Sequence, residues 1–138
     1  MKTSHLLILT GFFLLLTSCQ SYRESKISED FNRGTGNYFK MVRWHELDKA
    51  PLTFLADPLR DEFKKRVEAA KDVQITDYRV KNMECRPKEG KGEVTVEWEY
   101  YVPPSFTLKT VEDPQRWEYV EKNDDKGWML MTLFPEFK

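Results

Sequence analysis

The sequence predicts an α+β domain in which N-terminal helices pack on a curved antiparallel sheet of about four strands, giving a cone-like shape. Two patterns carry this prediction. Between residues 38 and 70, apolar side chains recur every three or four positions, and from residue 73 onward they alternate with polar ones. Helical segments therefore come first and strands follow, with no internal repeat. That order is typical of an antiparallel sheet covered by helices on one face.

The chain begins with a leader. Residues 6–16 form an uncharged, mostly apolar run behind Lys2. At about 1.5 Å per residue, this run is too short for the roughly 30 Å hydrocarbon core of a bilayer. The pattern therefore favours a signal peptide over residues 1–18, not a transmembrane helix.

The leader ends in Leu16-Thr17-Ser18-Cys19, which resembles the lipobox of bacterial lipoproteins. In that family a diacylglyceryl group is attached to the cysteine sulfur, the leader is cut just before the cysteine, and the new amino group is usually acylated. The resemblance implies cleavage between Ser18 and Cys19 and membrane attachment through lipid, such as palmitate, on Cys19. Gln20, in place of an aspartate, implies the outer membrane, facing the periplasm. An ordinary signal peptide cut elsewhere is the alternative.

Residues 20–36 are polar, mixed in charge and end in two glycines. We expect them to form a flexible tether behind Cys19, so that residues 19–36 link the leader to one α+β domain over residues 37–138. Asn37 or Thr35 is expected to cap a first helix over residues 38–49.

Pro51 interrupts the helical pattern and predicts a second, short helix over residues 52–56. Asp57-Pro58 is a helix-start signal. From there the apolar spacing predicts a third helix that ends near Asp72.

Strand signals fill the rest of the chain. The pattern of residues 73–86 predicts a strand in which the alternation of apolar side chains between the two faces changes phase twice, with a bulge near Asp77. Residues 94–102 alternate cleanly, which indicates one buried and one solvated face. Residues 106–111 and 117–122 are one strand bent at Asp113-Pro114 or two strands, and residues 128–134 are the last strand.

The hairpin Trp117-Glu118-Tyr119-Val120, a polar turn, then Gly127-Trp128-Met129-Leu130, together with the order of elements, resembles the nuclear transport factor 2-like (SnoaL-like) superfamily. The resemblance implies helices wrapped by a curved sheet around a conical pocket. That superfamily contains isomerases, cyclases and dehydratases as well as non-enzymatic binding domains, so the fold alone does not assign a function.

Composition excludes several function classes. The chain has 22 Lys and Arg against 23 Asp and Glu, so it lacks the basic surplus that nucleic acid requires. Cys85 is left without a partner if Cys19 carries lipid. We expect it to be a buried, inert thiol, with an intermolecular disulfide or a reactive thiol as the alternatives. With Cys19 lipidated, one free cysteine and one histidine remain in the mature chain, too few for a structural zinc site, and no metal or other cofactor is expected.

His45 is the one candidate for catalysis, expected on the inner stripe of the first helix. As a general base it needs an orienting carboxylate, such as Asp48, Asp77 or Glu97. The simpler hypothesis is a histidine at the margin of the core that is hydrogen-bonded to a carbonyl group. Five aromatic residues line a possible pocket or simply form the core: Trp44, Trp98, Tyr100, Trp117 and Trp128.

The sequence thus favours a membrane-anchored envelope lipoprotein whose non-catalytic domain binds an envelope protein or a small apolar ligand. A small pocket enzyme of the same fold, with acid–base chemistry of the isomerase, cyclase or dehydratase type, is the alternative. A structural spacer between membrane and cell wall is a third hypothesis.

Overall fold

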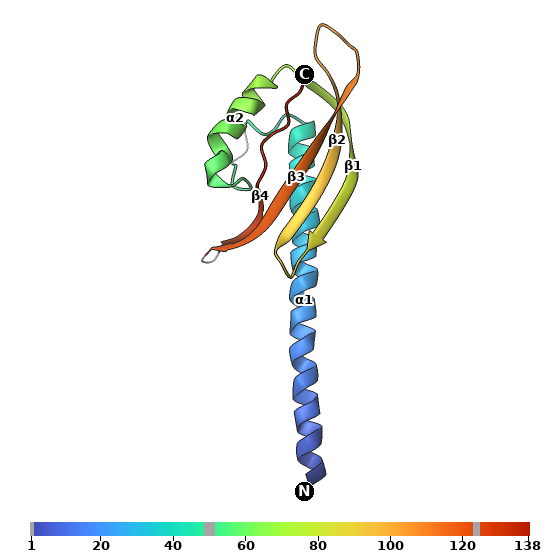
Figure 1. Ribbon diagram of the computed structural model, residues 1–138, viewed down its shortest axis with the longest axis vertical. Helices are drawn as coiled ribbons and strands as arrows, with labels where there is room; N and C mark the ends of the chain where they lie inside the picture. Colours follow the sequence, from blue (N-terminus) through green and yellow to red (C-terminus); the bar gives the residue numbers. More distant parts are fainter. Residues whose placement is uncertain (1, 49–51, 123–124) are drawn as a thin grey trace.

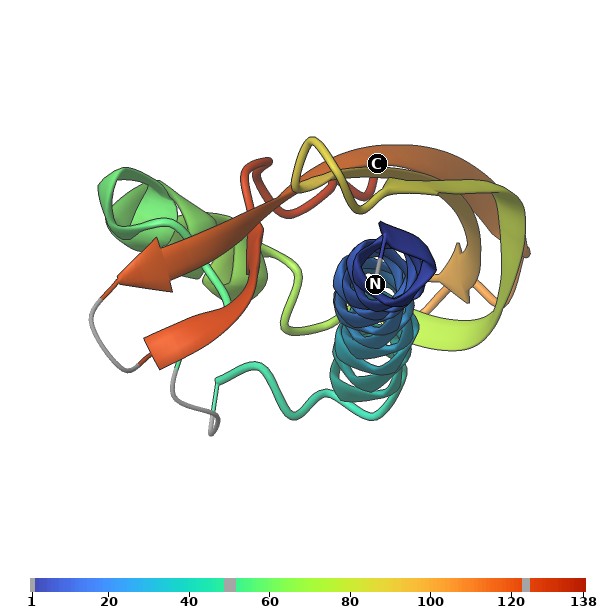
Figure 2. The same cartoon turned by 90° about the horizontal axis from the view of Figure 1, so that it is seen from below.

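The structure, a computed structural model, describes residues 2–48, 52–122 and 125–138. A long helix α1 (Lys2–Arg43) is followed by a 3-10 turn η1 (Asp57–Leu59) and a short helix α2 (Arg60–Ala69). Four antiparallel strands follow in the order in which they occur in the chain: β1 (Gln74–Arg86), β2 (Lys91–Tyr101), β3 (Lys109–Lys122) and β4 (Asp125–Leu130). The expected α+β class is confirmed. The sheet curves around the C-terminal half of α1, and α2 lies beyond β3 and β4 (Figures 1 and 2).

The segment over residues 20–36 is not a flexible tether. It is helical throughout and belongs to α1, so Thr35 and Asn37 lie inside a helix and cap nothing. The reason is packing: Ile27, Phe31 and Thr35 recur every fourth residue, and all three are buried. The sheet supplies the apolar surface against which this sparse stripe packs, and that burial stabilises the helix.

The end of α1 is also earlier than expected, at Arg43 instead of residue 49. His45 follows with a φ of 54°, in the left-handed region. Its N–H donates to the carbonyl of Val42 at 3.3 Å, and the N–H of Glu46 donates to the carbonyl of Met41 at 2.9 Å. These two bonds are those of a Schellman motif, with His45 at the position where glycine is usual.

Residues 52–56 do not form the expected short helix. Leu55 forms an isolated parallel bridge with Leu130 instead. The start signal at Asp57-Pro58 is confirmed, because η1 begins at Asp57 and continues into α2. The carboxylate of Asp57 makes no capping hydrogen bond; it pairs with Arg60 at 2.8 Å.

The sheet confirms the main strand signals. The register of β1 against β2 shifts between Ile75 and Asp77 and again between Val80 and Asn82, which accounts for both slips in the alternation. β3 is one strand, and Pro114 lies opposite Thr95 of β2, in a part of β3 that β4 does not pair. Proline is tolerated at such an edge position. β4 ends at Leu130, earlier than expected.

The core lies between α1 and the concave face of the sheet. The Phe31 ring is 4.7 Å from that of Trp128, and the Tyr38 ring is 5.7 Å from that of Trp117. Gly92 of β2 leaves the space that the Phe31 ring fills. Ile27 is the first buried side chain that the structure describes, so a chain that starts at Gln20 retains the whole described core.

Candidate functional site

Cys19 is exposed and lies on α1, eight residues before the first buried side chain. The helix extends beyond the sheet at this end (Figure 1). The Arg23 guanidinium donates to Glu121 of β3 at 2.8 Å, which ties the emerging helix to the end of the sheet. Arg23 lies four positions after Cys19, or about 6 Å along a helix. A lipid on Cys19 would therefore lie close below this end of the domain.

Four of the five aromatic residues proposed for a pocket belong to the core. Trp98, Tyr100, Trp117 and Trp128 are all buried, whereas Trp44 is 66% exposed. The arrangement corresponds to core packing, the simpler of the two hypotheses, because the three tryptophan rings pack against aromatic rings of α1 and the Tyr100 ring packs against Phe137. Trp44 stands apart, with the Arg43 guanidinium 4.9 Å from its ring.

A buried polar network crosses this core. The Trp98 indole N–H donates to Asp113 at 3.1 Å, and the Gln115 amide donates to the same carboxylate oxygen at 2.7 Å. The Trp117 indole N–H donates in turn to the Gln115 amide oxygen at 3.1 Å. Burial raises the pKa of Asp113, and these hydrogen bonds oppose the rise. Burial, and then the charge of Asp113, raise the pKa of Tyr38 well above its usual value.

Sequence reasoning missed this network. The signal was present in the spacing, because Asp113, Gln115 and Trp117 alternate along one face of β3 and all point inward. The network satisfies the indole groups of two buried tryptophans, which is a structural role. It does not line the cavity described next.

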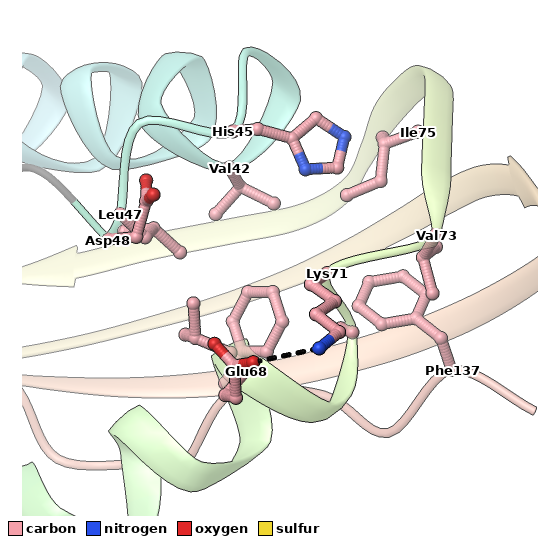
Figure 3. Close-up of a pocket in the computed structure, with 12 residues that line it drawn as sticks. Val42, His45, Leu47, Asp48, Glu68, Lys71, Val73, Ile75 and Phe137 are labelled. Atoms are coloured by element: carbon pink, nitrogen blue, oxygen red, sulfur yellow. Dashed lines mark hydrogen bonds and ion pairs between the residues drawn. The ribbon is translucent and has the colours of Figure 1, made fainter.

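A cavity of about 140 Å³ lies where α1 and α2 end and β1 begins, and the C-terminal segment forms one side of it (Figure 3). Its polar side chains are exposed: His45, Asp48, Glu68 and Lys71. The rest of the lining is apolar and largely buried: Val42, Leu47, Val67, Ala70, Val73, Ile75, Phe134 and Phe137.

His45 is therefore not on the inner stripe of a helix, as expected; it lies past the end of α1 and is exposed. Among the described residues its imidazole has no hydrogen bond. Of the three carboxylates considered for it, Asp48 lines the same cavity. Glu97 instead pairs with Arg79 at 3.0 Å, and Asp77 accepts a hydrogen bond from the N–H of Tyr78 at 2.8 Å.

Cys85 is half-buried and not disulfide-bonded. Its sulfur lies 3.9 Å from the Ser28 hydroxyl oxygen. Burial raises the pKa of the thiol, and the contact with Ser28 opposes this. A raised pKa lowers the thiolate fraction, in keeping with the expected inert thiol.

No protein-family model, curated protein or solved structure matches this chain. Within residues 2–48, 52–122 and 125–138, no helix combines the length and apolar character needed to cross a bilayer. The same residues contain no group of three or more His, Cys, Asp or Glu side chains arranged to hold a metal ion.

Proposed function

We propose that this chain is an envelope lipoprotein, held in the membrane by lipid on Cys19, whose domain binds a ligand or partner without catalysis. The motif Leu16-Thr17-Ser18-Cys19 carries the proposal. The exposed position of Cys19 on a part of α1 that extends beyond the sheet supports it, because the folded body leaves this cysteine uncovered.

The helix adds a geometric consequence. Cys19 and Val42 lie on one continuous helix, so the anchor and the cavity are about 35 Å apart at roughly 1.5 Å per residue. A docked helix holds that separation, whereas a flexible tether would not. The cavity would therefore face away from the bilayer, accessible to molecules in the periplasm.

The non-catalytic part of the proposal has its own support. The buried Asp113 and Tyr38 lie within the core, and His45 has no hydrogen-bonded carboxylate among the described residues. A general base needs both access to substrate and a group that orients it.

Metabolic labelling with palmitate tests the anchor. We expect the wild-type chain to take up label and to fractionate with the outer membrane, and Cys19→Ser to do neither. Cys85→Ser is the matched control and should label normally. A Cys19→Ser protein that still takes up label, or a wild-type protein that never does, overturns the proposal.

A pocket enzyme is the second candidate, because His45 and Asp48 line the same cavity. If Asp48 orients the imidazole, it holds one tautomer, which nitrogen NMR shifts of the ring report. We expect Asp48→Asn to leave the tautomer ratio of His45 unchanged. A clear change in that ratio would favour the enzyme over the binding domain.

A further inference from the structure

The cavity at the end of α1 has an apolar interior of defined size. Eight apolar side chains line it, from α1, α2, β1 and the segments next to them, and its volume is about 140 Å³. A cavity of roughly 150 Å³ lined by Leu, Ile and Phe accepts one benzene ring in another protein. The space therefore suits one six-membered ring or a branched chain of similar size.

The polar side chains of the cavity are unevenly charged. Asp48 and Glu68 each contribute a carboxylate, and Lys71 contributes the one ammonium group among the described lining residues (Figure 3). That ammonium is already bound to Glu68 at 3.1 Å. Among the described residues no cation pairs with Asp48. These three side chains form the charged mouth of the cavity, where carboxylates outnumber cations. This excess favours a ligand that brings a positive charge.

His45 lies beside the cavity in a strained backbone conformation. Its φ of 54° is disfavoured for a residue with a Cβ atom, and glycine meets the same Schellman geometry without strain. The imidazole lines the cavity next to the apolar groups (Figure 3). Strained residues of this kind concentrate at binding sites.

We propose that this cavity binds a small amine, with one compact apolar group in the interior and an ammonium group beside Asp48 and Glu68. The inference rests on the ligand-binding form of the proposed function. Lipid labelling does not depend on it, so a failure of amine binding in a correctly labelled protein refutes this inference alone.

Three probes of one size separate apolar fit from charge: benzylamine, benzyl alcohol and benzoate. Binding is followed by methyl NMR shifts of Val42, Val73 and Ile75 in a chain that starts at Gln20 and retains all buried residues that the structure describes. We expect saturable shifts with benzylamine, weaker binding of the alcohol, and the weakest binding of benzoate. Absence of saturable shifts, or tighter binding of benzoate than of benzylamine, refutes the proposal.

Charge variants test the mouth directly. Asp48→Asn and Glu68→Gln should each weaken benzylamine about two- to five-fold, the range for exposed charge pairs, while leaving benzyl alcohol unchanged. Lys71→Gln should tighten benzylamine by a similar factor, because it releases Glu68. Glu89→Gln, in the β1–β2 turn, is the matched control and should change nothing. If all three mouth variants bind benzylamine as the wild type does, the assigned site is wrong.

A cavity-filling variant provides a second check. Ala70 lines the cavity at the end of α2, and Ala70→Leu adds volume there. We expect it to abolish the methyl shifts with both benzylamine and benzyl alcohol, with circular dichroism confirming that the domain is folded. Unchanged binding in a folded Ala70→Leu protein would place the probes elsewhere and refute the proposal.

Discussion

Replacing Gly92 with alanine tests whether residues 20–36 are docked as a helix. A Cβ atom at Gly92 would overlap the ring of Phe31, whose Cδ2 atom, the third nearest, would be only 3.1 Å away. Gly92 does not have a positive φ, so the backbone itself accepts alanine. The effect of this substitution therefore reports on the Phe31 ring above β2 and on little else.

A docked helix and a flexible tether predict opposite changes in the free energy of unfolding when Gly92 is replaced with alanine. With α1 docked, overpacking should lower the free energy of unfolding by about 1–3 kcal/mol. With a flexible tether, Gly92→Ala should raise it by about 0.5–1 kcal/mol, because glycine weakens strands. Urea unfolding of the chain that starts at Gln20 measures the difference.

The Phe31→Ala background provides the control. Phe31 is fully buried, so its removal alone should cost about 3–5 kcal/mol. With the ring absent, Gly92→Ala should become neutral or stabilising, giving a coupling energy of about 1–3 kcal/mol in a double-mutant cycle. Additive effects of the two substitutions would refute the docked helix.

Three further predictions concern single groups. Burial raises the pKa of Asp113, so between the unfolded and folded pKa values the folded protein keeps a proton that the unfolded chain has lost. The free energy of unfolding should therefore fall as pH rises from about 4 through the folded pKa. Asp113→Asn should flatten this dependence, measured by urea unfolding between about pH 4 and 8. Equal slopes in the two proteins would contradict it. His45→Gly should raise the melting temperature by a few degrees, since relief of a left-handed φ contributes about 1 kcal/mol; a lower value would show that the imidazole stabilises the fold. Burial raises the pKa of Cys85, so in a Cys19→Ser chain iodoacetamide should modify Cys85 several-fold faster at pH 8 in urea than in buffer, and equal rates would show that the thiol is open in the folded state.

Strand patterns were predictable because their signals are local. The alternation of Val94, Val96 and Trp98 gives the buried face of β2 directly, and the two phase slips in β1 correspond to its two register shifts. The start of the helical segment at Asp57 was predictable for the same reason, since proline and its neighbours act on the adjacent backbone.

The candidate site was much less accessible to sequence reasoning. Asp113 and Gln115 look like solvated strand residues until the register places them beneath α1, next to Trp98. The cavity joins His45, Glu68 and Phe137, which belong to three separate segments. No local pattern predicts that these segments meet.

The sequence by itself determined the strand periodicity, the helix start at Asp57 and the α+β class, because each depends on residues a few positions apart. The tertiary structure decided the state of residues 20–36. Two glycines and a thin apolar stripe favour a coil in isolation, but Phe31 finds its partners in Gly92 and Trp128, far along the chain. Burial against a surface formed by distant residues outweighs the weak local preference, and a local pattern does not report that energy.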